Sequence, residues 1–173
     1  MEIRPLPAEE AAIRRFVDDL FVSYNRDLEA IVDRFALDDG VDPASSERTF
    51  WLDRLDDEDH RTWVAVDGPA EADDFAAVDG DLVGFVATDV EESPAPFDRP
   101  DRLCICDRYV REPHRGTGLA RELFERARTR ARETGCGEFR LEVDADNERA
   151  VACYEKLCSE VARHEMLADV ERG

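Results

Sequence analysis

Apolar residues recur at helical spacing in the first 55 residues of the chain. One face of a predicted helix collects six of them: Ile13, Phe16, Val17, Leu20, Phe21 and Tyr24. A second stripe over residues 28–35 stops before Gly40. Asp42 followed by Pro43 is typical of a helix start, because Asp caps the first turn and Pro lacks the N–H that would stay unpaired there. We therefore predict a third helix that runs to about Leu55.

β-Branched and aromatic residues then dominate several short segments, which is the pattern of strands. We predict strands over residues 3–6, 62–66, 82–90, 103–110, 139–143 and 161–170, the first at a sheet edge. Two amphipathic helices separate the last three strands: one over 117–134, ended by Gly135, and one that starts at Asp146 or Asn147. Helices first, then a meander, then a β-α-β-α-β order predict an α+β fold.

The length of 173 residues fits one domain, so we take residues 1–173 as a single unit. Acidic residues number 43 against 23 Lys and Arg, which gives a net charge of −20. Such a chain lacks the cationic face that nucleic acids and anionic membranes require, which argues against both as partners. No apolar run approaches a membrane span, and the first residues lack a signal-peptide pattern. We expect a cytoplasmic protein, either a monomer or a homodimer.

The charge is unevenly distributed along the chain. Residues 1–100 carry 27 acids and 9 bases, whereas residues 101–173 carry 16 acids and 14 bases, and Lys156 is the only lysine. Acid excess with almost no lysine indicates a halophilic, archaeal source, because concentrated salt screens the repulsion between carboxylates. An acidic protein from an arginine-rich genome is the alternative. The nearly neutral second part suits a site for an anionic ligand.

Residues 110–120 carry the clearest sign of chemistry. A strand ends there, and a loop with Gly116 and Gly118 opens directly into an amphipathic helix. Glycine leaves the backbone accessible, and the first N–H groups of a helix have no intrahelical partner, so together they form an anion site suited to phosphate. Arg115 and Arg121 can add charge-assisted contacts. The spacing matches neither a P-loop nor a dinucleotide fingerprint, and a plain strand-to-helix turn is the alternative.

This segment resembles a known family. Arg115-Gly116-Thr117-Gly118-Leu119-Ala120 fits the pyrophosphate loop of the GNAT superfamily of acyl-CoA-dependent N-acetyltransferases, Arg/Gln-x-x-Gly-x-Gly/Ala. A second motif of the same family is resembled by residues further along this chain: Leu141-Glu142-Val143, Asn147, Ala150 and Tyr154-Glu155-Lys156-Leu157. Two ordered motifs at the family's usual separation are more specific than either alone, and the close resemblance covers residues 103–158. Cys158-Ser159 stand where the family has Gly-Phe.

The resemblance implies a GNAT fold: a mixed, mostly antiparallel sheet of six or seven strands flanked by helices, in which splayed parallel strands form the cleft for CoA. Residues 1–100 would form the acceptor side and residues 101–173 the acetyl-CoA side. The strand backbone at Tyr109 and Val110 would pair with the pantetheine arm. The pyrophosphate would be held over Arg115, Gly116, Thr117, Gly118, Leu119, Ala120 and Arg121. Asn147 would contact the CoA arm, or would simply cap its helix.

For catalysis, the resemblance implies that Tyr154 protonates the departing CoA thiolate, a role that a neutral phenol can fill. An aromatic on the core face of the last helix is the alternative. Glu142 matches the glutamate that serves as general base in the N-terminal-amine branch of the family, so it is the first candidate base. Asp107, on the neighbouring strand, is the second. For both, an ordinary carboxylate on a strand face is the alternative.

The predicted function is direct acetyl transfer from acetyl-CoA to a primary amine of a small molecule or peptide, within a ternary complex. The alternative is a non-catalytic acyl-CoA-binding regulatory module of the same fold. We predict no metal site, because the three histidines are scattered and the five cysteines lack ligand spacing. The cysteines indicate free thiols in a reducing compartment.

Overall fold

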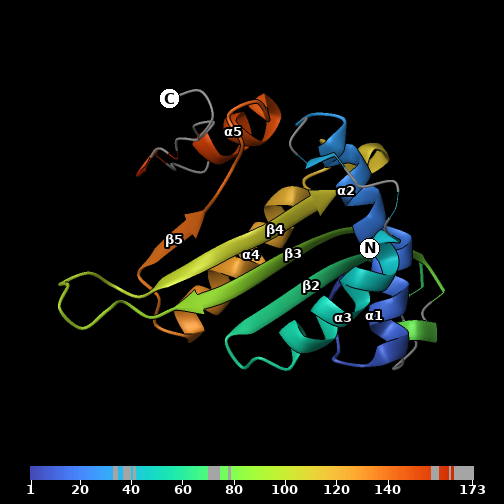
Figure 1. Cartoon of the computed structure of the whole chain (residues 1–173), viewed down its shortest axis with the longest axis horizontal. Coiled ribbons are helices and arrows are strands. Elements are labelled where there is room, and N and C mark those ends of the chain that lie inside the picture. The colour runs from blue at the N-terminus through green and yellow to red at the C-terminus, as the bar shows by residue number, and fades with distance from the viewer. Residues whose placement is uncertain are drawn as a thin grey trace. The chain divides into compact units, whose positions relative to one another are not determined.

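The structure, a computed structural model, describes residues 1–32, 35–36, 40, 42–69, 75–77, 79–156, 160–163 and 165. The chain forms two compact units, Met1–Glu142 and Val143–Gly173. The first unit contains a sheet and helices α1 to α4 (Figure 1). The second contains helix α5 (Glu148–Glu155).

The described residues form one five-stranded sheet in the order β1-β2-β3-β4-β5. The strands are β1 (Glu2–Pro5), β2 (His60–Asp67), β3 (Asp81–Glu91), β4 (Arg102–Val110) and β5 (Glu138–Leu141). β1 to β4 pair antiparallel, and β5 pairs parallel to β4. The mixed, mostly antiparallel sheet and its edge strand β1 are thereby confirmed. The strand number differs from the predicted six or seven: residues 160–163 form no strand, and most of the predicted strand over 161–170 lies outside the described residues.

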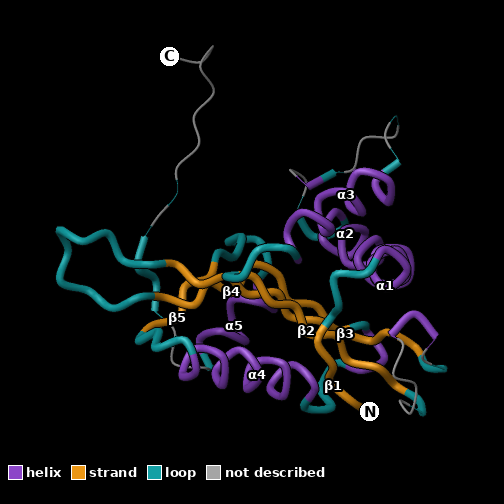
Figure 2. The backbone as a smooth tube through the Cα atoms, turned by 90° about the horizontal axis from the view of Figure 1, so that it is seen from below, coloured by secondary structure: helices purple, strands orange, loops and turns teal. Residues whose placement is uncertain are grey.

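Helical residues from the first third of the chain cover one face of this sheet. α1 (Glu10–Phe16), a π-helical turn η1 (Val17–Phe21) and α2 (Val22–Glu29) follow one another without a break, and α3 (Pro43–Leu55) packs against α1 and β2. α4 (Leu119–Glu133) covers the opposite face (Figure 2). α2 ends at Glu29, so the stripe over 28–35 does not continue as an α-helix through residues 30–32; residue 35 lies in a 3-10 turn, and residues 33 and 34 lie outside the described residues. The predicted start of α3 is confirmed, because the Asp42 carboxylate accepts a hydrogen bond from the Ala44 N–H at 3.2 Å.

An aromatic core lies between these helices and the sheet. Phe16 packs edge-on against Trp51 and against Phe85, with ring centroids 5.0 and 5.1 Å apart, and all three side chains are fully buried. Burying a side chain of this size contributes about 1.5–3 kcal/mol. Of the six apolar residues predicted on one helix face, five are buried and Tyr24 is half-buried. The core therefore fixes α1 to α3 over the middle of the sheet.

α4 packs its buried residues Leu119, Leu123 and Phe124 on β3 and β4. Gly84 of β3 permits this close approach, since an added Cβ would lie 3.3 Å from Leu119 Cδ2 and 3.4 Å from Leu123 Cδ1. α4 ends as predicted at Gly135, which has a φ of +76°. In the part of the chain that the structure describes, no helix combines the length and the apolar character needed to cross a membrane.

Candidate active site

The parallel strands β4 and β5 separate after a short paired stretch. Their pairing runs from Arg102 opposite Glu138 to Ile105 opposite Leu141. β4 continues to residue 110, so among the described residues its edge over 106–110 has no strand partner on that side (Figure 1). An open strand edge of this kind can pair with an extended ligand.

A β-bulge in β4 marks the same point. Asp107 faces Ala87 and Ile105 faces Thr88, which leaves Cys106 without an opposite residue in β3. A bulge bends its strand and re-aims the neighbouring side chains. The open edge and the re-aimed side chains therefore begin at one place.

The loop that follows β4 presents backbone N–H groups. Gly116 and Gly118 have φ values of +79° and +100°, a region that favours glycine, and Gly118 immediately precedes α4. An added Cβ at either glycine would meet no atom within 4 Å. Within the described residues, the N–H groups of 116–120 make no hydrogen bond to the backbone. Together with the dipole of a 15-residue helix, they match the pattern predicted for an anion site, and binding of a pyrophosphate there stays a prediction.

Arg115, predicted to contact the cofactor, is held by neighbouring groups of the protein. Its Nη2 donates to Asp27 Oδ2 at 2.6 Å, and its Nε donates to the Val110 carbonyl oxygen at 2.9 Å. The Tyr109 hydroxyl donates to the same Asp27 oxygen at 3.0 Å. Burial, reinforced by this hydrogen bond and the Asp27 charge, raises the pKa of Tyr109 to about 12. Arg121 lies exposed in the first turn of α4.

A cavity of about 240 Å³ lies where β4 and β5 separate. Three segments line it: α3 through Arg54, β4 through residues 104–107, and β5 with its next residue through Arg140 and Glu142. Both candidate bases therefore reach one cavity.

Asp107 is half-buried and is the less exposed of the two candidate bases. Its Oδ1 accepts a hydrogen bond from the Tyr24 hydroxyl at 3.2 Å. Burial raises the pKa of Asp107, although the Arg54 charge and the Tyr24 hydrogen bond act in the opposite direction. Glu47 of α3 is close enough to interact: burial, followed by the charge of Asp107, raises the pKa of Glu47 as well. A carboxylate with a raised pKa is the better proton acceptor.

Glu142 has a different setting. Its side chain is 80% exposed, and it accepts a hydrogen bond from Arg140. The same guanidinium donates to Glu91 of β3. Glu142 thus faces solvent and a cation.

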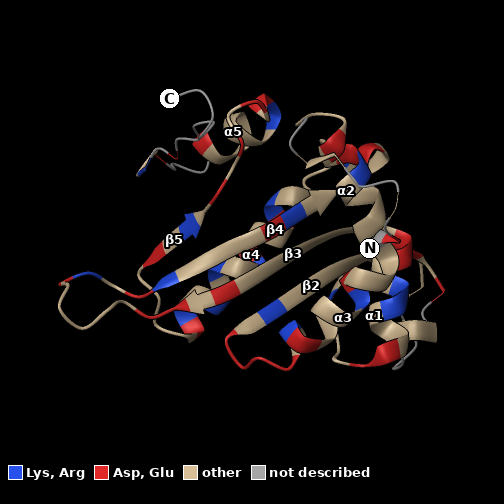
Figure 3. Cartoon of the chain, in the orientation of Figure 1, with Lys and Arg blue, Asp and Glu red and all other residues tan. Residues whose placement is uncertain are grey.

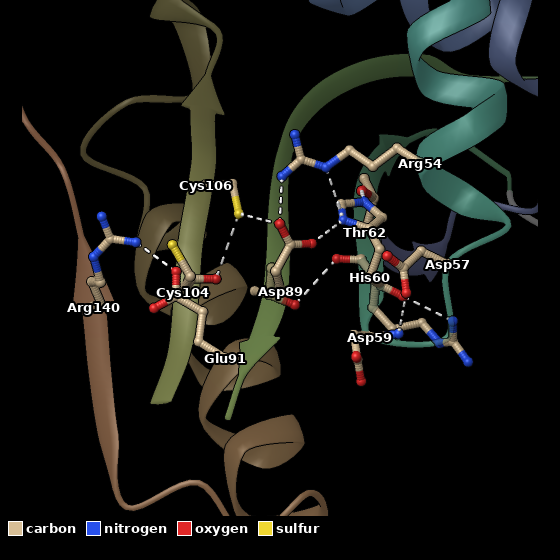
Figure 4. Close-up of polar contacts among 12 residues, drawn as sticks. Arg54, Asp57, Asp59, His60, Thr62, Asp89, Glu91, Cys104, Cys106 and Arg140 are labelled. Atoms are coloured by element: carbon tan, nitrogen blue, oxygen red, sulfur yellow. Dashed lines mark hydrogen bonds and ion pairs between the residues drawn. The ribbon is translucent and has the colours of Figure 1, made fainter. Parts of the chain in front are cut away.

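A polar cluster extends from the cavity across the sheet (Figure 4). His60 is 1% exposed, with Nδ1 2.5 Å from Asp89 Oδ1 and Nε2 2.8 Å from Thr62 Oγ1. Arg54 Nη2 and the Cys106 thiol donate to Asp89 Oδ2 at 2.8 and 3.1 Å. Burial acts to raise the pKa of Asp89, but the hydrogen bonds from His60 and Cys106 and the Arg54 charge outweigh it and lower the pKa to about 2. Sequence reasoning missed this cluster, because its members come from four separate elements.

Within the described residues, no group of three His, Cys, Asp or Glu side chains is arranged to hold a metal ion. Four of the five cysteines are described, and none of the four forms a disulfide: Cys104, Cys106, Cys136 and Cys153.

Two predicted site residues lie in the second unit. Asn147 caps α5, and its side-chain oxygen accepts a hydrogen bond from the Ala150 N–H at 3.2 Å, so the capping interpretation is confirmed. Tyr154 lies near the end of α5 and is half-buried. Contacts of both residues with the cofactor stay predictions.

Comparisons with known proteins identify the family. The profile of the acetyltransferase (GNAT) family matches residues 20–159. Streptothricin acetyltransferase of Streptomyces lavendulae is 32% identical over 155 residues, covering 90% of this chain, which spans about 60% of that relative's length. A tetramutant of the BH1408 protein from Bacillus halodurans superposes with a TM-score of 0.72 at 17% identity, covering 98% of this chain and 100% of that one. The aminoglycoside N-acetyltransferase AAC(6')-Iy, solved with a bisubstrate analogue of CoA, gives a TM-score of 0.64 at 12% identity, covering 97% and 96%. The two solved structures show a shared fold, and the family match shows that this chain belongs to the acetyltransferase (GNAT) family, whose members use acetyl-CoA.

Proposed function

We propose that this protein transfers the acetyl group of acetyl-CoA to a primary amine of a small-molecule acceptor, by direct attack in a ternary complex. One observation carries the proposal: a single compact unit joins the N–H-lined loop at 116–120, the open strand edge at 106–110 and a cavity lined by the half-buried Asp107. In this proposal the loop binds the pyrophosphate, the open strand edge pairs with the extended pantetheine arm, and the carboxylate accepts the proton of the amine. Relatives named for streptothricin and aminoglycosides support a small-molecule acceptor.

The cofactor side of the proposed site is formed mainly by backbone groups. The N–H groups of 116–120 would hold the pyrophosphate, with Arg121 adding charge from the first turn of α4. The open edge at Tyr109 and Val110 would pair with the pantetheine arm, and Asn147 would contact that arm. Bound acetyl-CoA supplies the acetyl thioester. Residues 101–173 would thus serve the cofactor and residues 1–100 the acceptor, within one functional domain.

We assign the general base to Asp107 rather than to Glu142. An acceptor amine is an ammonium ion at neutral pH, so it must lose a proton before it attacks. Asp107 would take that proton, and the nitrogen would then bond to the thioester carbonyl carbon as the C–S bond breaks. Tyr154 would donate its hydroxyl proton to the departing thiolate and regain one from water, while the new amide nitrogen would release its remaining surplus proton to water. An N–H of the open β4 edge would polarise the thioester carbonyl.

The charge around the cavity favours a cationic acceptor. Glu47, Asp107 and Glu142 are carboxylates at or near it. The cavity arginines are already bonded to acids, Arg54 to Asp89 and Arg140 to Glu91. Unlike charges attract and orient an incoming ligand, so an amine with more than one positive charge fits best.

The test is release of free thiol from acetyl-CoA with a panel of amines that includes streptothricin, an aminoglycoside, a polyamine and a dipeptide, in concentrated KCl. We expect turnover with at least one multiply charged amine. Tyr154→Phe should lower kcat about 10-fold or more while CoA affinity stays unchanged. CoA binding without turnover on any amine would favour the regulatory module instead.

We also infer that the protein works in the salt-rich cytoplasm of a halophilic archaeon. Acidic positions gather on the loop between α3 and β2 and at the helix ends (Figure 3). The net charge of −20 and the single lysine, Lys156, support this inference.

A further inference from the structure

Helix α2 contacts both parts of the proposed site. Tyr24 and Asp27 lie three residues apart, and residues at this spacing share a helix face. Tyr24 donates to Asp107 at the acceptor cavity. Asp27 accepts from Arg115 at the start of the cofactor loop and from Tyr109 at the end of β4. The rings of Tyr24 and Tyr109 lie 5.6 Å apart and connect the two contacts.

Arg115 uses two different nitrogens to join three segments. Nε reaches the last carbonyl of β4 at Val110, and Nη2 reaches α2 at Asp27. The guanidinium also lies over the Tyr109 ring, 5.9 Å from its centroid. A planar guanidinium can make these contacts together, whereas a lysine ammonium on a flexible stem cannot.

A second arginine holds the chain four residues before Arg115, directly after β4. The Arg111 N–H donates to the Val83 carbonyl oxygen at 2.9 Å, and its side chain donates to the Asp19 carbonyl oxygen of η1. The segment between the two arginines is therefore attached to the helical layer at both ends. This attachment fixes the point at which the loop at 116–120 begins.

We propose that Asp27 is a positioning residue for acetyl-CoA. Asp27 holds Arg115, so that Arg115 fixes the start of the cofactor loop instead of binding phosphate, a role that we call a brace. The inference rests on the proposed function, because it concerns the same loop. Without the brace, the loop at 116–120 samples more conformations, and ordering it on binding reduces affinity. Asp27 has no direct contact with the anion in this account.

The experiment measures binding of CoA alone to the full chain by calorimetry. Asp27→Asn should raise the Kd about tenfold, within the range usual for coupling between sites. Asp18→Asn is the matched control, because Asp18 is a half-exposed acid of the same helical stretch that pairs with Arg48 at 2.6 Å, the distance of the Asp27–Arg115 pair. The control should stay within about twofold of wild type. Both variants should have the same thermal midpoint without CoA.

Further variants show whether Arg115 acts through its two hydrogen bonds or only through its positive charge. Arg115→Lys should weaken CoA binding as much as Arg115→Met, because the brace needs both nitrogens. Asp27→Glu, which keeps the carboxylate, should restore most of the affinity lost in Asp27→Asn. A mere loss of stability would not produce this pattern.

The opposite results are equally clear. Tighter CoA binding in Asp27→Asn, with a steeper salt dependence, would mean that the freed Arg115 binds phosphate, and this would overturn the inference. Equal Kd values for Asp27→Asn and Asp18→Asn would also overturn it, while leaving the proposed function intact. Failure of the wild-type chain to bind CoA would overturn the proposed function and this inference with it.

Discussion

Replacing Asp107 with Asn separates its chemistry from its packing. Asn has nearly the same shape, and its side-chain oxygen can still accept the Tyr24 hydroxyl, which lies 3.2 Å from Asp107 Oδ1. An amide cannot take the proton of an ammonium ion. We therefore expect kcat/KM for acetyl transfer to fall about 10²–10⁴-fold, the usual contribution of a general base.

The same substitution should stabilise the protein. Burial raises the pKa of folded Asp107 above its ordinary value of 3.8, so the fold disfavours the ionised carboxylate. This penalty is absent below the ordinary pKa, develops as the pH rises to the raised pKa of the folded state, and is complete above it. Asn carries no charge, so the variant should gain on the order of 1 kcal/mol near neutral pH. For a chain of this size the thermal midpoint should rise by about 2–4 °C.

Initial rates and urea unfolding across the pH range measure both effects, with Glu142→Gln as the control at the exposed carboxylate. If Asp107→Asn keeps more than a tenth of the wild-type kcat/KM, Asp107 is not the base. If Glu142→Gln loses a hundredfold, the base is Glu142. If Asp107→Asn is less stable than wild type near neutral pH, the fold does not disfavour the charge.

Gly118→Ala should raise the Kd for CoA about tenfold, because a φ of +100° costs a non-glycine residue about 1–2 kcal/mol. The fold should stay intact, because the new Cβ meets no atom within 4 Å. An unchanged Kd in calorimetry would contradict this prediction. Asp89→Asn should destabilise by about 1 kcal/mol near neutral pH, since its carboxylate is partly exposed. The pKa of Asp89 is about 2 in the folded protein and 3.8 ordinarily, so the stabilisation by its charge is full above pH 3.8 and disappears toward pH 2. If urea unfolding shows that Asp89→Asn is still less stable than wild type at about pH 2, the loss comes from packing and not from charge. Raising KCl from about 0.1 M to about 2 M should raise the thermal midpoint, because salt screens the self-repulsion of a net charge of −20; a flat or falling midpoint would remove the support for a halophilic source.

Features that depend on neighbours a few residues apart could be predicted from the sequence. The Asp42 cap of α3, the Gly135 end of α4 and the Asn147 cap of α5 all involve contacts within one helical turn. The π-helical turn at residues 17–21 was not predictable, because apolar spacing identifies the buried face and not the register of the backbone hydrogen bonds.

The loop at 116–120 and the cavity with the candidate bases also differ in how far the sequence predicts them. The conformation of the loop at residues 116–118 was predictable, because positive φ values favour glycine at Gly116 and Gly118, whereas its contact with a cofactor stays a prediction. The sequence ranked Glu142 above Asp107, and spacing could not show which carboxylate is the less exposed. That depends on Tyr24, 83 residues away in sequence, and on Arg54 of α3. Contacts of such long range leave no periodic signal.

The nearly neutral charge of residues 101–173 does not leave all of their arginines available to an anionic ligand. Several of its arginines are bonded to acids: Arg102 to Glu138, Arg115 to Asp27, Arg128 to Glu125, and Arg140 to Glu91 and Glu142. The cofactor loop instead presents backbone N–H groups. In about 1 M salt, attraction between charges is screened beyond about 3 Å, whereas N–H hydrogen bonds act at contact. A backbone cradle braced by paired arginines therefore suits anion binding by an acidic protein in concentrated salt better than an array of unpaired arginines would.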